Sequence, residues 1–405
     1  MVMQDQSPKP EIVIMGEASE GALAQARNCR IEAEAMLLMA DNHQGYGMPV
    51  GGVAVYTDRI APAGVGFDIG CGNKAVRTDL TLADIKGRLA LLADEMYAQL
   101  AFGVGQANKT RVEDALFDDP LWQTSPFLRA SGDLKATARA QLGSIGAGNH
   151  YVNVFADEGE RIWVGVHFGS RSLGHAIASH FMKQAGDKPN AMDAAPKTLP
   201  VKSALGRDYI ACMQLAGRYA YAGRDWACDR VVEILGGEIV EEVHNHHNFA
   251  WHEEHDGQNY WVVRKGATPA FPGQRGFVGA SMGGVSVILQ GVDSAQSRGL
   301  YYSTVHGAGR VMSRSAAAGR RRRVKRQATR KDGRVVNVTE WVQSGGQVDF
   351  PSVQKELARQ GIILRGSGAD EAPEVYKDLD KVLEAHAGTV EVLHRLRPLI
   401  VCMAA

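Results

Sequence analysis

The sequence predicts an α+β fold, a single large mixed domain over residues 1–405 in which central β-sheets are flanked by helices. Strand-like and helix-like segments follow one another without the regular strand–helix–strand order of a doubly wound sheet. Residues able to carry chemistry are scattered from position 68 to position 376, with no internal repeat or clear linker between them. A site assembled from such distant segments favours one integrated domain.

The individual elements follow from local composition. Helical composition and spacing predict helices over 17–40, 81–101, 203–235 and within 376–386. Short apolar runs that end at glycine or proline predict strands in 50–62, 72–80, 162–170, 259–267, 275–282, 284–291, 390–396 and 398–403. Residues 103–135, with FDDPLWQTSPF, are predicted to be irregular.

The composition describes a protein that can bury a core and stay in water. Hydrophobic residues make up 45% of the chain, and its 45 basic and 45 acidic residues balance. No global field therefore attracts nucleic acid, although a local one still can. The five cysteines are widely spaced and form no CxxC pair, which argues for a reducing compartment. Without a signal-like start or an 18-residue apolar run, we expect a cytoplasmic protein with no membrane span.

Three glycine-rich motifs place possible ligands beside turns. FDIGCG brings Asp68 within three residues of Cys71, and a thiolate can bridge two metal ions. SIGAGNHYVNV carries Asn149 and His150, and WVGVHFGSRSLG carries His167 followed by Arg171. Each histidine taken alone is more often a satisfied core residue, and Cys71 alone is more often a small core residue. Arg171, among small residues, is typical of an anion site.

Histidines and small residues recur further along the chain. VHNHHNFAWHEEH holds five histidines within 12 residues, which indicates metal, although only one or two of them can point inward together. GASMGG, residues 279–284, is a small-residue loop that can lie against a nucleotide.

The stretch STVHGAGRVMSR, residues 303–314, sets His306 against two glycines and two arginines. Gly307 and Gly309 leave room for close approach to the backbone, and Arg310 and Arg314 offer planar donors for phosphate. Soon after it, nine of the fifteen residues from Arg320 to Arg334 are basic. Such a run is most often a solvated face, but this density favours contacts with phosphate backbones. The segment lacks aromatic residues that would stack unpaired bases.

Five motifs in one order, FDIGCG, GNH, HFGSR, HHN and HGAGRVMSR, resemble those of the RtcB family of RNA-splicing ligases. The similarity runs from about residue 40 to the C-terminus, and DNHQGYGMPVGGV and DEAPEVYKDLD extend it at the two ends. The resemblance implies an RtcB-like fold and an enzyme that joins RNA 3′-phosphate or 2′,3′-cyclic phosphate ends to 5′-hydroxyl ends. It also implies two Mn²⁺ ions and GTP.

The resemblance assigns roles to particular residues. Its metal ligands match Asp68, Cys71, His150, His167 and His247, with Cys71 bridging the two ions. Its nucleotide-accepting residue matches His306, which would form a GMP-histidine intermediate. Nucleotide contacts are implied for Asn149, Ser281, Gly307, Ala308, Gly309, Arg310 and Tyr376, and phosphate or RNA contacts for Arg171, Arg310 and Arg314.

Two positions depart from the family pattern. Asn153 stands where the family has a glutamate that reads guanine, and Ala404 stands where it has a lysine. A carboxylate can accept from both guanine N–H groups, whereas an amide accepts one and donates as well. These departures leave the metal and histidine chemistry untouched but put GTP specificity in doubt, so ATP is an alternative.

Two other functions compete with ligation. A metal-dependent phosphoesterase that opens cyclic phosphates would need the metal ligands but not His306, and an RNA-binding protein would need only the basic segment. The sequence leaves open whether the RNA comes from transfer-RNA splicing or from damage repair. It also leaves open an activating protein partner, and we expect a monomer.

Overall fold

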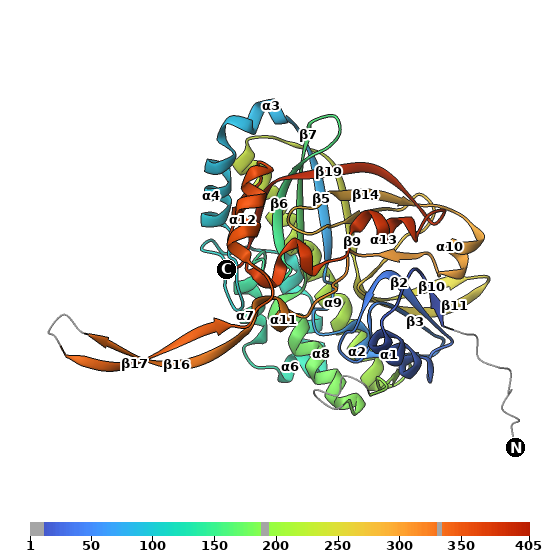
Figure 1. Ribbon diagram of the computed structural model, residues 1–405. Helices are drawn as coiled ribbons and strands as arrows, with labels where there is room; N and C mark the ends of the chain where they lie inside the picture. The colour runs from blue at the N-terminus through green and yellow to red at the C-terminus, as the bar shows by residue number, and fades with distance from the viewer. Residues whose placement is uncertain (1–11, 188–193, 330–333) are drawn as a thin grey trace, which may run out of the picture.

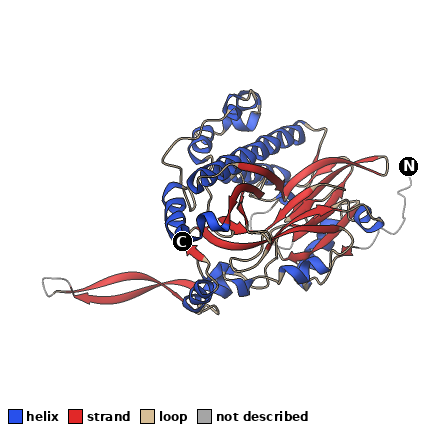
Figure 2. Ribbon diagram, turned by 90° about the horizontal axis from the view of Figure 1, so that it is seen from above, coloured by secondary structure: helices blue, strands red, loops and turns tan. Residues whose placement is uncertain are grey.

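The computed structural model describes residues 12–187, 194–329 and 334–405. Helices and strands are mixed along the chain and form two large sheets with helices packed on them, which confirms the α+β prediction (Figures 1 and 2). The extent of a single domain over 1–405 stays a prediction. Among the described residues, no helix has both the length and the apolar character needed to cross a bilayer.

The larger sheet has eight strands, in the order β13–β14–β19–β6–β7–β5–β9, with β18 pairing β19 beside this path. Each neighbouring pair along the path is antiparallel. The strands are β5 (Gly72–Thr81), β6 (Tyr151–Ala156), β7 (Arg161–Phe168), β9 (Ile239–His246), β13 (Arg275–Val278), β14 (Ser286–Gly291), β18 (Ile363–Arg365) and β19 (Val390–Met403). The two strands predicted at 390–396 and 398–403 are one, β19, with an irregularity at Pro398.

The smaller sheet has the order β1–β2–β3–β11–β10. Its strands are β1 (Val13–Ile14), β2 (Ala35–His43), β3 (Val50–Tyr56), β10 (Asn248–His255) and β11 (Gln258–Lys265). The helix predicted over 17–40 was wrong in its second half, because the helix ends at Arg30 and β2 follows. Residues 36–42 are buried on both faces of the sheet, and this burial overrides their helical propensity.

The helices cover the faces of both sheets. They are α1 (Glu20–Arg30), α2 (Pro62–Val65), α3 (Leu82–Ile85), α4 (Leu89–Gln99), α5 (Leu121–Thr124), α6 (Pro126–Ala130), α7 (Leu134–Gln141), α8 (Arg171–Ala185), α9 (Ala204–Leu235), α10 (Ala295–Gly299), α11 (Arg314–Ala318), α12 (Phe350–Arg359) and α13 (Leu379–Glu384). Single 3₁₀ turns are η1 (Lys86–Arg88), η2 (Ala115–Asp118), η3 (Ala369–Glu371) and η4 (Pro373–Val375). Region 103–135, predicted to be irregular, forms η2, α5, α6 and the start of α7, because Asp114 and Ser125 cap short turns.

Three two-stranded sheets complete the described part of the structure. They are β4 (Arg59–Ile60) with β8 (Leu199–Pro200), β12 (Ala267–Pro269) with β15 (Ser303–Val305), and β16 (Arg320–Thr329) with β17 (Val335–Ser344). The β16–β17 hairpin projects away from the rest of the protein in both ribbon views (Figures 1 and 2).

The register of the larger sheet brings four strand ends together. Gly72, at the start of β5, pairs with Phe168 at the end of β7 and with His246 at the end of β9. Tyr151, at the start of β6, pairs with His167. Because neighbouring strands are antiparallel, the residues that precede β5 and β6 lie beside those that end β7 and β9. All of them meet at one end of these strands.

Candidate functional site

A cavity of about 300 Å³ lies at these strand ends of the larger sheet. Of the site residues predicted from the sequence, all except Arg171 line it, and all belong to the described part of the chain. They are Asp68, Cys71, Asn149, His150, His167, His247, Ser281, His306, Gly307, Ala308, Gly309, Arg310, Arg314 and Tyr376. The cavity therefore brings together motifs that lie far apart in the sequence, whereas the chemical role of each residue stays a prediction.

A cluster of nitrogen, oxygen and sulfur atoms occupies one side of the cavity. The Cys71 Sγ atom lies 3.6 Å from His150 Nε2 and 3.7 Å from His167 Nε2. His150 Nε2 lies 3.1 Å from Asp68 Oδ2. The potential ligand atoms of Cys71, His150 and His167 all lie within 4.8 Å of one another. Gly169 has to be glycine here, because a Cβ atom would lie 2.3 Å from Asp68 Oδ1.

The ionisation of these groups suits a bound cation. Burial opposes ionisation of Asp68, but the hydrogen bond and charge of His150 outweigh it and lower the pKa to about 2. Burial raises the pKa of the Cys71 thiol, and the Asp68 carboxylate adds to this effect. Burial lowers the pKa of His167 and of His247 well below the usual value, so both rings are neutral. Neutral imidazole is the form that binds metal, and a cation would hold Cys71 as the thiolate.

Two asparagines fix how the neutral rings point. His167 Nδ1 lies 2.6 Å from Asn73 Oδ1, and the Asn73 amide nitrogen donates to the carbonyls of Phe277 and His306. His247 Nδ1 lies 3.2 Å from Asn248 Oδ1, which also accepts from Gly266 N–H. Because both asparagine oxygens can only accept, each ring carries its proton on Nδ1 and turns its Nε2 lone pair toward the cavity. His247 Nε2 is buried without a hydrogen-bond partner, as expected of a metal ligand.

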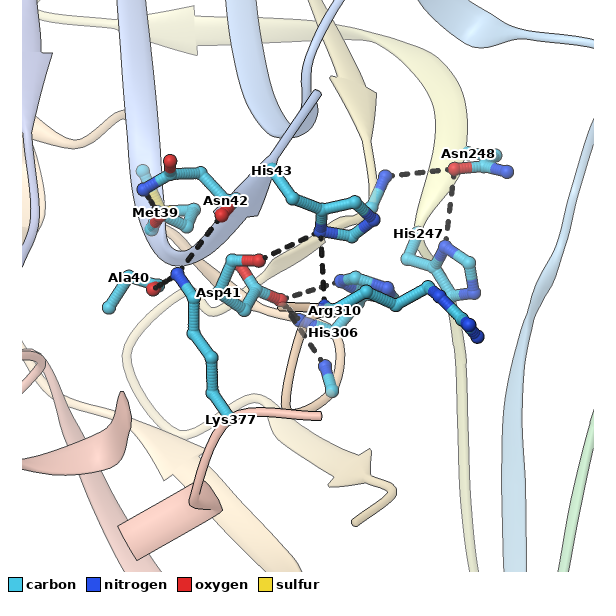
Figure 3. A network of polar contacts seen from close by, with 12 residues as sticks. Met39, Ala40, Asp41, Asn42, His43, His247, Asn248, His306, Arg310 and Lys377 are labelled. Atoms are coloured by element: carbon cyan, nitrogen blue, oxygen red, sulfur yellow. Dashed lines mark hydrogen bonds and ion pairs between the residues drawn. The ribbon is translucent and has the colours of Figure 1, made fainter. Parts of the chain in front are cut away.

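His306 is held by a carboxylate to which the sequence motifs had given no role. Asp41, fully buried at the end of β2, accepts from His306 Nδ1 at 2.6 Å and from His306 N–H at 3.0 Å (Figure 3). Burial opposes ionisation of Asp41, but the charge and hydrogen bonds of His306 outweigh it and lower its pKa. When the ring is neutral, its proton lies on Nδ1 and Nε2 of His306 has the free lone pair. The His306 ring lies 4.7 Å from that of His247, between centroids.

The segment that carries Asp41 is itself tied down. Lys377 Nζ donates to the carbonyls of Ala40 and Asn42, at 2.8 Å and 3.0 Å (Figure 3). His43 Nδ1 lies 3.1 Å from the Asp41 carbonyl and 3.4 Å from Arg310 N–H. These contacts fix the position of the carboxylate on both sides. DNHQGYGMPVGGV, the motif that contains Asp41, was a signal that could have identified it.

Arg310 and Arg314 are paired with acidic residues of η3. Arg310 donates to Glu371 at 3.3 Å, to the Tyr376 hydroxyl at 3.1 Å and to the Asp370 carbonyl at 2.7 Å. Arg314 pairs with Asp370 at 2.6 Å and with Glu371. Arg310 is therefore committed to this network, while Arg314 is half exposed at the cavity rim. Glu371 is buried between the two guanidinium groups, and the sequence motifs gave it no role although DEAPEVYKDLD contains it.

A buried arginine joins the two segments that carry Cys71 and His167. Arg224, on α9, donates to the carbonyl of Gly70 at 2.9 Å and to that of Phe168 at 2.5 Å. It also contacts His246 Nδ1 at 2.9 Å and His244 Nε2 at 2.8 Å. Of the five histidines in the histidine-rich segment, only His247 lines the cavity, while His244 and His246 pack behind it against Arg224. His255 pairs with Glu253, and His252 is exposed.

The remaining predicted residues lie around the cluster. Asn149 Nδ2 is 3.4 Å from His167 Nε2. Arg171 lies behind His150, with its Nη1 atom 3.2 Å from His150 Nδ1. Asn153 lines the cavity from β6, and its Oδ1 atom is buried without a partner. Ala404 does not line the cavity, although Met403 does.

Similarity to known proteins extends over most of the chain. A family model described as tRNA-splicing ligase RtcB matches residues 22–344. The chain is 30% identical to RNA-splicing ligase RtcB1 of Escherichia coli, with 90% of this chain and 89% of that protein covered. It is 31% identical to tRNA-splicing ligase RtcB of Thermococcus kodakarensis and 32% identical to that of Archaeoglobus fulgidus, covering 90% of this chain and 86% of each. The protein belongs to the RtcB family.

Proposed function

We propose that this protein is an RNA ligase that joins a 3′-phosphate or 2′,3′-cyclic phosphate end to a 5′-hydroxyl end, in RNA splicing or repair. Family membership supports the ligase class. The observation that carries the mechanism is His306, held by Asp41 with its Nε2 lone pair free, beside a cluster of metal-ligating atoms. A histidine so placed is an activated nucleophile.

In the proposed reaction, His306 Nε2 attacks the α-phosphorus of a nucleoside triphosphate, and pyrophosphate leaves. A phosphorus–nitrogen bond forms as a phosphorus–oxygen bond breaks. Asp41 stabilises the positive charge that develops on the ring and keeps its proton on Nδ1. A 2′,3′-cyclic end is first hydrolysed by water to a 3′-phosphate. The nucleotide then moves from His306 to an oxygen of the RNA 3′-phosphate as the phosphorus–nitrogen bond breaks. The 5′-hydroxyl of the second RNA attacks the phosphorus of that activated end, and nucleoside monophosphate leaves.

Divalent ions fit the residues at hand. Asp68, Cys71, His150, His167 and His247 would hold two divalent ions. Ligand softness alone favours zinc or iron for such a set, and the family resemblance favours Mn²⁺. Bound ions would neutralise charge on the reacting phosphate. The protein's own part is to present neutral imidazoles, fixed by Asn73 and Asn248, and to keep Asp68 ionised.

GTP and ATP are the two candidate nucleotides for this reaction. Asn153 offers one acceptor and one donor, and its unpartnered Oδ1 atom lies at the cavity wall. An amide can pair with an edge of either purine that presents one donor and one acceptor. We propose relaxed base selection, and comparable use of the two nucleotides is the expected result. A strong preference for GTP would contradict it.

The test is a joining assay with two synthetic RNAs, one ending in a 2′,3′-cyclic phosphate and one starting with a 5′-hydroxyl. With Mn²⁺ and either nucleotide we expect a joined product, which disappears in His306→Ala. His252→Ala, which changes an exposed histidine, is the control and should join normally. A wild-type protein that opens the cyclic phosphate but never joins the ends, with His306→Ala equally active, would be a phosphoesterase. A protein that binds RNA and alters neither end would be an RNA-binding protein.

A further inference from the structure

The β16–β17 hairpin, residues 320–344, is strongly basic although the chain as a whole has no formal net charge. We call this hairpin the basic arm. The arm holds nine basic residues and two acidic ones, Asp332 and Glu340. The whole chain has 45 basic and 45 acidic residues, so 36 basic and 43 acidic residues lie outside the arm. The arm therefore carries a formal charge of +7, and the rest of the chain carries −7. The positive field is concentrated in one element.

The shape of the arm presents this charge away from the protein body. The two strands pair antiparallel from Arg320 with Ser344 to Thr329 with Val335, without a register shift. A ten-residue strand extends about 30 Å at the usual rise. Within the described residues the two strands pair only with each other, and both ribbon views show them projecting outward (Figures 1 and 2). Arg320, Arg323, Arg326 and Arg334 are exposed.

The base of the arm is fixed at the rim of the cavity. The α11 helix begins at Arg314, which lines the cavity, and Gly319 alone separates the end of α11 from the start of the arm. Gln347 and Val348, which follow the arm, donate to the carbonyls of Ala316 and Ala317 at 3.0 Å and 3.2 Å. A molecule that lies along the arm is thereby led toward the cavity.

We propose that the basic arm binds the sugar–phosphate backbone of a base-paired RNA whose ends are joined in the cavity. This inference rests on the proposed function. Charge complementarity supports it, because a dense row of arginines binds phosphate backbones without reading sequence. Trp341 is the sole aromatic residue of the arm sequence, so the arm has little with which to stack unpaired bases. A-form duplexes are recognised through their backbone, which suits this composition.

The test compares two variants of the full-length protein. In the arm variant, Arg320, Arg323, Arg326 and Arg334 are changed to glutamine. In the control, four exposed basic residues elsewhere, Arg27, Lys86, Arg129 and Lys183, are changed in the same way. A third protein lacks residues 320–344 and joins Gly319 directly to Gly345. This deletion is geometrically mild, because a Cβ atom on Gly319 would lie 2.5 Å from the Ser344 carbonyl.

Binding of a hairpin RNA with a base-paired stem and a 3′-phosphate is measured from 50 to 200 mM salt. The arm variant should bind at least about 10-fold more weakly at the low-salt end, with a log–log salt slope shallower by roughly 3. The deletion should show a larger loss, and the control should stay within about 2-fold of wild type. Equal loss in the arm variant and the control would overturn the proposal, as would unchanged RNA binding in the arm variant.

Two further readouts separate this proposal from its alternatives. Nucleotide transfer to His306 is measured without RNA in each protein, and the arm variant should react at the wild-type rate. If wild type forms no adduct while the arm variant still loses RNA binding, the proposed function fails and the arm inference stands. Vesicles containing phosphatidylserine form the last probe. Arm-dependent binding to these vesicles together with arm-independent binding to RNA would overturn the inference in favour of a membrane surface.

Discussion

At the scale of single residues, the site depends on oxygen atoms that fix histidine protons. Asp41 Oδ2, Asn73 Oδ1 and Asn248 Oδ1 each lie next to the Nδ1 atom of a different ring, those of His306, His167 and His247. The three Nε2 atoms consequently present lone pairs to one cavity. The difference between the rings lies in charge, because only His306 is held by a carboxylate. That carboxylate marks His306 as the ring suited to bear positive charge during nucleophilic attack.

Replacing Asp41 with asparagine tests this assignment. The amide keeps the shape but loses the charge, and it can turn its NH₂ group toward His306 Nδ1, which would place the proton on Nε2. We expect nucleotide transfer to His306 to slow by about 100-fold or more, measured as the rate of adduct formation. Asp58→Asn, at an exposed position remote from the cavity, is the matched control. A wild-type rate in Asp41→Asn would remove the carboxylate from the mechanism.

A second residue-scale prediction concerns Asp225. Its carboxylate accepts a hydrogen bond from Lys74 Nζ at 2.6 Å and lies 3.3 Å from His244 Nδ1. Burial opposes its ionisation, but hydrogen bonds from His244 and Lys74 outweigh it and lower the pKa to about 2. Because this folded-state pKa lies below the usual value near 3.9, the stabilisation is present above pH ~4 and is lost as the pH falls toward 2. Asp225→Asn should therefore lower the free energy of unfolding at pH 7, and by less at pH 3. Urea unfolding of both proteins at the two pH values measures this, and a pH-independent difference would contradict the assignment.

At the scale of elements, the loop after β15 owes its shape to Gly309. This residue has φ +76°, and a Cβ atom would lie 2.1 Å from the Asp41 carbonyl oxygen. Nucleotide access was the one reason for this glycine that the sequence suggested, whereas the structure shows that it also lets the His306 loop pack against β2. The glycine thus couples the loop that carries the proposed nucleophile to the strand that carries its carboxylate.

Gly309→Ala should lower the free energy of unfolding by more than backbone strain alone would. Gly388, with φ +81° and nothing within 4 Å of the position that a Cβ atom would take, is the matched control because it shares the strain without the clash. Gly388→Ala should cost about 1 kcal/mol of unfolding free energy, and Gly309→Ala about 2–4 kcal/mol with a loss of adduct formation. Equal costs, measured by denaturant unfolding, would show that the contact with Asp41 is unimportant.

Elements with a clear local signal could be predicted, and elements set by tertiary contacts could not. The strand at 162–170 and the helix at 203–235 appear as β7 and α9 because apolar pattern and burial agree there. Residues 35–40 have good helix-forming composition but form β2, since the neighbouring strands β1 and β3 supply its hydrogen bonds. The basic segment gave no strand signal, because its run of charged residues obscured the alternation that marks a hairpin.

At the scale of the whole molecule, the site lies where the strand ends of the larger sheet meet β2 of the smaller sheet. The sequence motifs supplied many of the cavity-lining residues, since glycine turns and histidines mark them locally, but Asn73 and Lys265 line the cavity without having been predicted. They did not supply Asp41 as the partner of His306, 265 positions away, or Arg224 as the link between the Cys71 and His167 segments. Such pairings depend on strand register and sheet order, which local patterns do not encode.

The proposed mechanism depends above all on His306, held by Asp41 beside the ligand cluster, accepting a nucleotide. The most direct measurement is the intact mass of the protein after incubation with Mn²⁺ and either GTP or ATP. We expect an acid-labile mass increase of one nucleoside monophosphate, absent in His306→Ala and much slower to appear in Asp41→Asn. Absence of an adduct with both nucleotides, in protein shown to bind the metal, would contradict the mechanism.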